Sequence, residues 1–317
     1  MTRQLRPMPL ETLQGLVPPP SSFPYFAHPE GIRFDPAAAG DHPANASWLA
    51  DASLLVYGDA TFIRDVFQQS PLPEQGYDLS LLAGDNGNRG MLLQSDSAMV
   101  FVFRGTRLET HTVLDAAEVV ILNQDDLWTD SQFLPAACRA GGKVHAGFLK
   151  AFSEVAPLLD ELAAKRLPRQ RVWLTGHSLG GSLATLAAAH LGPDAIQGLY
   201  TFGCPRVGDA AFASVLPTRS YVRFVHRDDW VPTVPTGLLG YVHGGTLRQV
   251  PSPPRNFFSD FTTGAKELAA TLRAMAANSN LNTGSLPFKI SGLADHAPVY
   301  YATLLWNALV ETREASG

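Results

Sequence analysis

Apolar and polar residues follow two kinds of pattern along the first third of the chain. Between residues 46 and 69 the apolar positions recur every three or four residues, which predicts helix, with Asp59 or Thr61 capping a second short helix. Two apolar runs around a Gly/Asn/Asp-rich segment at 84–88 predict a β-hairpin. Residues 98–103 form a continuous apolar run, as expected of a strand buried on both faces.

After residue 140 the predicted elements alternate between helix and strand. In chain order they are helix 145–166, strand 171–175, helix 179–191, strand 196–202, a short helix near 209–216, strand 220–225 and helix 296–310. This alternation predicts an α/β fold with a central, mostly parallel sheet flanked by helices. In such sheets the reactive groups collect at the carboxyl ends of the strands.

Length and charge restrict the class of protein. The 317 residues fit one domain with additions, which we take to be 1–317, with a proline-rich N-terminal arm at 1–45. The net charge of −5 argues against a nucleic-acid-binding protein, because such proteins usually carry a basic surface. Its apolar runs are shorter than the roughly 18 residues that a membrane-spanning helix needs. No signal peptide is visible, so we expect a cytoplasmic location by default, with secretion by another route as the alternative.

The two cysteines, Cys138 and Cys204, are too few for a disulfide framework, and we expect free thiols. Neither cysteine has the Cys/His neighbours of a zinc site. We therefore expect no metal and no organic cofactor.

The strongest chemical signal is the sequence Gly-His-Ser-Leu-Gly-Gly at 176–181. It follows a predicted strand and opens a predicted helix, which is the context that a G-x-S-x-G nucleophile motif requires. The sharp turn needs small residues on either side of Ser178, and it lifts the serine hydroxyl clear of the backbone. The positive end of the following helix points toward the place where negative charge develops in acyl transfer.

A serine nucleophile needs a histidine base, and the histidine needs an orienting carboxylate. Asp228 and Asp229 directly follow the predicted strand 220–225, so either can supply the acid. Downstream histidines are His190, His226, His243 and His296. His296 lies in a late loop that enters the last helix, which favours it over His243; His190 lies too far along its helix.

The oxyanion of the acyl-transfer intermediate needs two backbone N–H donors. One is expected from Leu179, directly after the serine. The other is expected from the loop that follows the buried strand 98–103, where Thr106 is the candidate.

Taken together, these segments resemble the class 3 lipases, the family of the fungal triacylglycerol lipases and their bacterial and plant relatives. The matching segments occur in the family's order: 102–106, 144–148, 176–181, 202–209, 229–232, 240–243 and 295–296 with Tyr300. The resemblance implies the α/β-hydrolase fold and selects Asp229 as the acid and His296 as the base. It also implies that His145 and His243 are structural, and that Thr106 and Leu179 form the oxyanion hole.

Residues 107–142 are long and apolar enough to form a lid-like insertion, and a lid favours a lipid ester as substrate. We therefore predict a triacylglycerol lipase or esterase that works through an acyl-enzyme on Ser178 and touches a lipid interface transiently. The alternatives are a phospholipase A1, a feruloyl-type esterase, or a non-catalytic lipid-binding homologue.

Overall fold

The computed structural model describes residues 5–9, 18–27, 32–84, 87–106, 135–216, 220–252 and 295–314. Within these ranges the chain forms a seven-stranded sheet in the order β1-β2-β3-β6-β7-β8-β9. The first three strands are antiparallel, and from β3 to β9 every neighbouring pair is parallel. The strands are β1 (Asp78–Gly84), β2 (Gly87–Gln94), β3 (Ala98–Phe103), β6 (Arg171–His177), β7 (Ile196–Phe202), β8 (Tyr221–Val225) and β9 (Thr246–Gln249).

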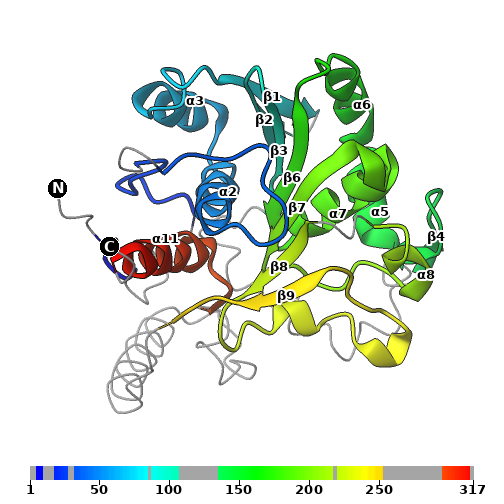
Figure 1. The fold of residues 1–317 in the computed structure, drawn as a ribbon. Coiled ribbons are helices and arrows are strands. Elements are labelled where there is room, and N and C mark those ends of the chain that lie inside the picture. The colour runs from blue at the N-terminus through cyan, green and yellow to red at the C-terminus, as the bar shows by residue number, and fades with distance from the viewer. Residues whose placement is uncertain are drawn as a thin grey trace, which may run out of the picture.

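Helices cover both faces of this sheet (Figure 1). One face carries α2, which packs against β6 and against the C-terminal helix α11; the other carries α7, with α5 packed outside it. A separate cluster of buried apolar side chains fills each side. The helices are α2 (Pro43–Leu55), α3 (Ala60–Gln69), α5 (Ala146–Ser153), α6 (Ala156–Ala164), α7 (Leu179–Leu191), α8 (Ala210–Ala213) and α11 (Pro298–Glu314). This arrangement is the predicted three-layer α/β fold.

Several predicted elements are confirmed within a residue or two. The hairpin, the buried strand at 98–103, strand 196–202 and helix 179–191 are all present. Asp59 caps α3 by accepting a hydrogen bond from the N–H of Phe62, whereas Thr61 lies inside the helix. α2 is buried on every side rather than on one face, because the N-terminal arm and α11 cover the side that turns away from the sheet.

The predicted single helix at 145–166 was wrong. The chain forms α5 and α6 instead, with a break at Glu154 and Val155. Pro157 explains the break, because proline lacks an N–H and its ring collides with the carbonyl four residues earlier in a continuous helix. The same residue type is well suited to the first turn of a helix, and α6 begins there.

The pattern missed three short strands. β9 is exposed along its whole length, so it lacks the apolar alternation that marks a strand in sequence. β4 (Pro135–Ala137) and β5 (Lys143–His145) are three residues each and pair in a small antiparallel sheet. Of the predicted lid at 107–142, residues 107–134 lie outside the described residues.

Of the predicted N-terminal arm at 1–45, residues 5–9, 18–27 and 32–42 contain turns and bends but no helix or strand, whereas 43–45 already belong to α2. Arg6 is buried and forms a bidentate ion pair with the buried Asp51 of α2, with its two terminal nitrogens 2.6 and 2.7 Å from the two carboxylate oxygens. The same guanidinium donates to the carbonyl of Ala302 in α11. The arm therefore joins α2 to α11. Among the helices that the structure describes, none is both long and apolar enough to cross a membrane.

Candidate active site

Ser178 occupies the turn between β6 and α7, with φ 57° and ψ −128°. A non-glycine residue rarely adopts this conformation, and such strain is concentrated at functional sites. The turn is tight because its two glycines touch: a Cβ atom on Gly176 would lie 2.3 Å from the carbonyl carbon of Gly180. A Cβ on Gly180 would lie 2.2 Å from the carbonyl oxygen of Phe103 at the end of β3. The G-x-S-x-G spacing therefore follows from steric exclusion.

The structure brings Ser178, His296 and Asp229 into one hydrogen-bonded row. Nε2 of His296 lies 2.9 Å from Oγ of Ser178. Nδ1 of His296 lies 3.0 and 2.9 Å from the two carboxylate oxygens of Asp229. Because a carboxylate only accepts hydrogen bonds, the proton of the neutral imidazole sits on Nδ1, and Nε2 is the atom that can accept the serine proton. Three side chains far apart in sequence thus have the geometry of a nucleophile, a base and an orienting acid.

Asp229 is 3% exposed, and its carboxylate accepts hydrogen bonds from Tyr301 and Val231 as well as from His296. Tyr301 of α11 donates to Oδ2 at 2.5 Å, and the N–H of Val231 donates to Oδ1 at 3.0 Å. Burial, and then the nearby Asp229 charge, raise the pKa of Tyr301 well above its usual value, so its hydroxyl keeps its proton. Asp228, the other candidate acid, is exposed, whereas Asp229 is the carboxylate that meets His296.

Gly203 at the end of β7 lies directly beneath this row. It has φ +56°, and a Cβ there would lie 2.7 Å from Oδ2 of Asp229 and 3.0 Å from the ring of His296. The absence of a side chain at this position leaves room for the acid and the base to meet.

A second row of hydrogen bonds lies behind His296. His177 is fully buried; its Nε2 donates to the carbonyl of His296 at 2.6 Å, and its Nδ1 lies 2.8 Å from the hydroxyl of Tyr57. Burial, followed by the proximity of His296, lowers the pKa of His177 well below 6.5. His177 is therefore neutral, and the hydroxyl of Tyr57 donates to it. The sequence pattern did not identify Tyr57 or Tyr301, because neither belongs to a motif that spacing marks out.

The other histidines considered for the site, His145, His190, His226 and His243, bond to groups other than Ser178. His145 caps α5 by accepting from the N–H of Phe148, His190 pairs with Asp160, and His243 donates to the carbonyl of Pro232. His226 is buried and donates to the carbonyl of Asp295. Of the two candidate bases, His296 is therefore the one that meets the serine, and His243 bonds to a backbone carbonyl instead.

The two predicted oxyanion donors lie on neighbouring segments. Leu179 begins α7, and the first N–H groups of a helix have no partner within the helix. Thr106 is exposed and follows β3, whose last carbonyl touches the first turn of α7 at Gly180. Their role toward an oxyanion stays a prediction.

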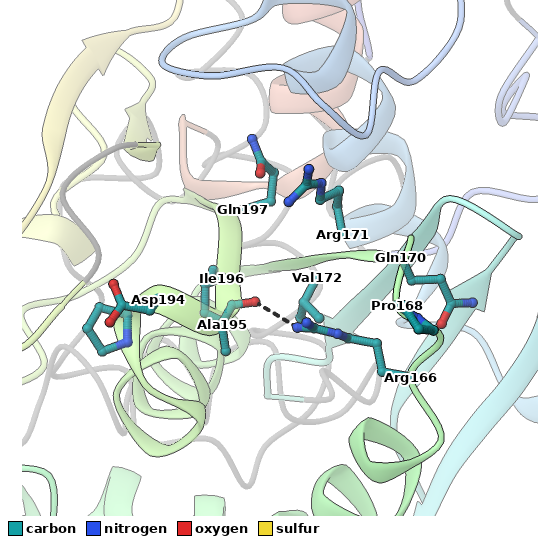
Figure 2. A pocket seen from close by; sticks show the side chains of 10 residues that line it. Arg166, Pro168, Gln170, Arg171, Val172, Asp194, Ala195, Ile196 and Gln197 are labelled. Carbon is teal, nitrogen blue, oxygen red and sulfur yellow. Dashed lines mark hydrogen bonds between the residues drawn. The ribbon is translucent and has the colours of Figure 1, made fainter.

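A hollow of about 290 Å³ lies at the other end of the strands, away from Ser178 (Figure 2). Arg166, Arg171, Asp194 and Gln197 are among the residues that line it, at the amino ends of β6 and β7. Ser178 lies at the carboxyl end of β6, so this hollow is not the site of the serine chemistry. Within the described ranges, no group of three or more His, Cys, Asp or Glu side chains is arranged to hold a metal ion.

The chain is similar in sequence to known lipases. Residues 100–238 match the family model described as lipase (class 3). The chain is 38% identical over 169 residues to the secreted mono- and diacylglycerol lipase 1 of Fusarium solani, covering 48% of this chain and 51% of that protein. It is 30% identical over 234 residues to a secreted mono- and diacylglycerol lipase of Malassezia globosa, covering 67% of this chain and 73% of that protein. This chain belongs to the class 3 lipase family.

This class 3 lipase also aligns with solved structures. One is lipase II from Rhizopus niveus, with 26% identity, a TM-score of 0.48, and coverage of 68% of this chain and 83% of that chain. The class 3 lipase spans about half the length, or less, of the curated relatives it matches first.

Proposed function

We propose that this class 3 lipase hydrolyses carboxylic esters of lipids, with Ser178 as nucleophile, His296 as general base and Asp229 as orienting acid. The observation that carries the proposal is the continuous row from Oγ of Ser178 through the imidazole to the buried carboxylate, with contacts of 2.9 to 3.0 Å. The strained backbone at Ser178 and the small residues around it support the same assignment.

The proposed reaction has two halves. Oγ of Ser178 attacks the ester carbonyl while Nε2 of His296 takes the serine proton, and the N–H groups of Leu179 and Thr106 stabilise the oxyanion. The imidazolium then protonates the departing alcohol, which leaves an acyl-enzyme. Water attacks the acyl carbonyl, His296 takes its proton, and the fatty acid is released as the serine regains its hydrogen.

Asp229 holds the imidazole in the tautomer with its proton on Nδ1 and stabilises its positive charge. Tyr301 and the N–H of Val231 hold the carboxylate in turn. The proposed chemistry needs no metal and no organic cofactor.

Acylglycerols are the substrate class that we propose. Two similar proteins are named as mono- and diacylglycerol lipases, which supports an acylglycerol over a feruloyl ester. Both are also named as secreted, so they do not support the cytoplasmic location that was expected by default. A panel of glycerol esters from C2 to C18, assayed above and below their solubility, tests both the substrate class and the proposed lid. Activity that does not change with the acyl-chain length, or with aggregation of the ester above its solubility, would contradict the proposed lid.

Replacing Ser178 with alanine tests the proposed nucleophile. We expect turnover of p-nitrophenyl butyrate to fall at least ~10³-fold, because the acyl-enzyme cannot form. Ser214→Ala, at an exposed serine at the end of α8, is the matched control and should keep normal turnover. Unchanged turnover in the Ser178 variant would exclude this mechanism.

The alternative is a lipid-binding protein without hydrolytic activity. A fluorophosphonate probe separates the two, because it forms an adduct only with an activated serine. Stoichiometric labelling at Ser178 favours the hydrolase, and the absence of any adduct in a folded protein favours the binding protein.

A further inference from the structure

A second histidine–aspartate pair lies beside the proposed catalytic one. His226 precedes Asp229 by three residues in the loop after β8, and Asp295 directly precedes His296. Both side chains are buried, with exposed fractions of 1% and 2%. The loop with the proposed acid therefore contains His226, and the loop with the proposed base contains Asp295.

His226 and Asp295 join the two loops by direct hydrogen bonds. Nδ1 of His226 donates to the carbonyl oxygen of Asp295 at 3.0 Å, and lies 3.9 Å from its carboxylate. In return, the N–H of Asp228 donates to the carboxylate of Asp295 at 3.3 Å. The contact is thus reciprocal: a side chain of each loop bonds to the backbone of the other.

Tyr301 connects this pair to the proposed catalytic row. Its hydroxyl accepts from the N–H of His226 at 3.1 Å and donates to Oδ2 of Asp229 at 2.5 Å. The imidazole of His226 also stacks on the ring of Tyr300, with 5.5 Å between the ring centres and 24° between the planes. The last helix therefore fixes the ring of His226 and the carboxylate of Asp229 together.

The loop held by these bonds is strained. Arg227 has φ 43°, a conformation that side chains other than glycine rarely adopt, and the N–H of Asp229 closes the turn onto the carbonyl of His226 at 2.9 Å. A strained turn needs surrounding contacts to hold it in place. The hydrogen bonds of His226 and Asp295 supply such contacts.

We propose that His226 and Asp295 are positioning residues, which hold the loop of Asp229 in register with the loop of His296. This inference rests on the proposed function. Neither residue touches the substrate; they act through the distance between the acid and the base, and through the placement of the imidazole relative to Ser178. A displacement of about 1 Å of a catalytic group can cost about 10²-fold in rate. The pair therefore affects turnover more than substrate binding.

Two substitutions of His226 provide a matched test. His226→Leu fills a similar volume but removes the donor, whereas His226→Asn places an amide N–H close to the former Nδ1. Turnover of p-nitrophenyl butyrate is measured per active site, by titrating the serine with a fluorophosphonate. We expect kcat per titrated site to fall about tenfold or more in the leucine variant with KM within about twofold, and to recover to within about threefold of wild type in the asparagine variant.

Asp295→Asn keeps an oxygen for the N–H of Asp228 and is the variant to use if the leucine variant does not fold. We expect its kcat per site to fall about two- to fivefold. A lower melting temperature with wild-type kcat per titrated site, in either variant, would overturn the positioning role and leave only a structural one.

The failure of this inference is distinct from the failure of the proposed function. If wild-type protein neither turns over esters nor reacts with the fluorophosphonate, the proposed hydrolase is wrong. If wild type does both, and His226→Leu does both equally well per site, only the positioning role is wrong.

Discussion

The hydroxyl of Tyr301 donates to the carboxylate of Asp229 across 2.5 Å, from the last helix into the loop after β8. Its raised pKa means that this hydroxyl remains a donor throughout the working pH range. A hydrogen bond to a charged group contributes about 1.5–3 kcal/mol. Without the hydroxyl of Tyr301, the carboxylate of Asp229 would be held less firmly, and it would orient the imidazole of His296 less well.

We expect Tyr301→Phe to lower kcat about 3- to 30-fold while the protein stays folded, since the ring itself is kept. Ester turnover against concentration, with thermal unfolding in parallel, checks this. Tyr300→Phe is the control, because the hydroxyl of Tyr300 donates to the carbonyl of Pro9 in the arm. Equal effects of the two substitutions would contradict a specific role for Tyr301.

Gly203→Ala should reduce turnover far more than it reduces stability. Its methyl group would meet both Asp229 and His296, so one of the two must move, and we expect kcat to fall about 100-fold. Gly192→Ala is a matched control, because Gly192 also has positive φ but has open space around its Cβ position. The control should lower the free energy of unfolding, because alanine is strained at positive φ, but it should leave kcat per titrated site normal.

The protein should become less stable in acid, because a histidine that is buried and neutral in the fold gains its proton more readily in the unfolded chain. Burial lowers the pKa of His145 to about 4 from 6.5. Between pH 6.5 and 4 the unfolded chain binds a proton that the folded protein excludes, so the free energy of unfolding decreases as the pH falls through this window. Above pH 6.5 the histidine is neutral in both states, so the free energy of unfolding no longer changes with pH because of it.

We expect His145 to account for about 1–2 kcal/mol of this loss by pH 5. Urea unfolding at pH 7.5 and pH 5 measures it, and His145→Gln should reduce the difference between the two pH values. A Gln variant with the pH dependence of wild type would show that His145 does not contribute.

Arg6→Met should destabilise the protein by about 3–5 kcal/mol, because it leaves Asp51 charged and buried without its cation. The double variant Arg6→Met/Asp51→Asn should recover much of this loss. Urea unfolding compares them, with Arg89→Met as control, since Arg89 pairs with Glu154 where both side chains are partly exposed. Exposed pairs contribute only about 0–1 kcal/mol. Similar losses at Arg6 and Arg89 would refute the prediction.

The sequence predicted the elements that leave a pattern in their own stretch of chain, either a run or repeat of apolar residues or a local steric requirement. Strand β3 is buried at every position, and the elbow at Ser178 is constrained by contacts between its own glycines, so both leave a local pattern. The pairing of Asp229 with His296 was assigned from family resemblance, because chain order alone left Asp228 and His243 as candidates.

The supporting residues could not be predicted in the same way. Tyr57 and Tyr301 reach the site from helix ends that are distant in sequence, and a buried tyrosine has the same sequence signature whether its hydroxyl meets a catalytic group or a carbonyl. β9 has no buried face, so its position is set by pairing with β8 rather than by hydrophobicity. Such features arise from tertiary contacts, which periodicity does not record.

The left-handed backbone at Ser178 has a practical consequence for engineering. Glycine adopts this conformation without the cost that a side chain adds, so replacing the serine should raise the melting temperature while abolishing hydrolysis. A directed-evolution campaign that scores only heat resistance would therefore enrich inactive clones with glycine at position 178. Selection for a robust catalyst from this scaffold has to score turnover in every round.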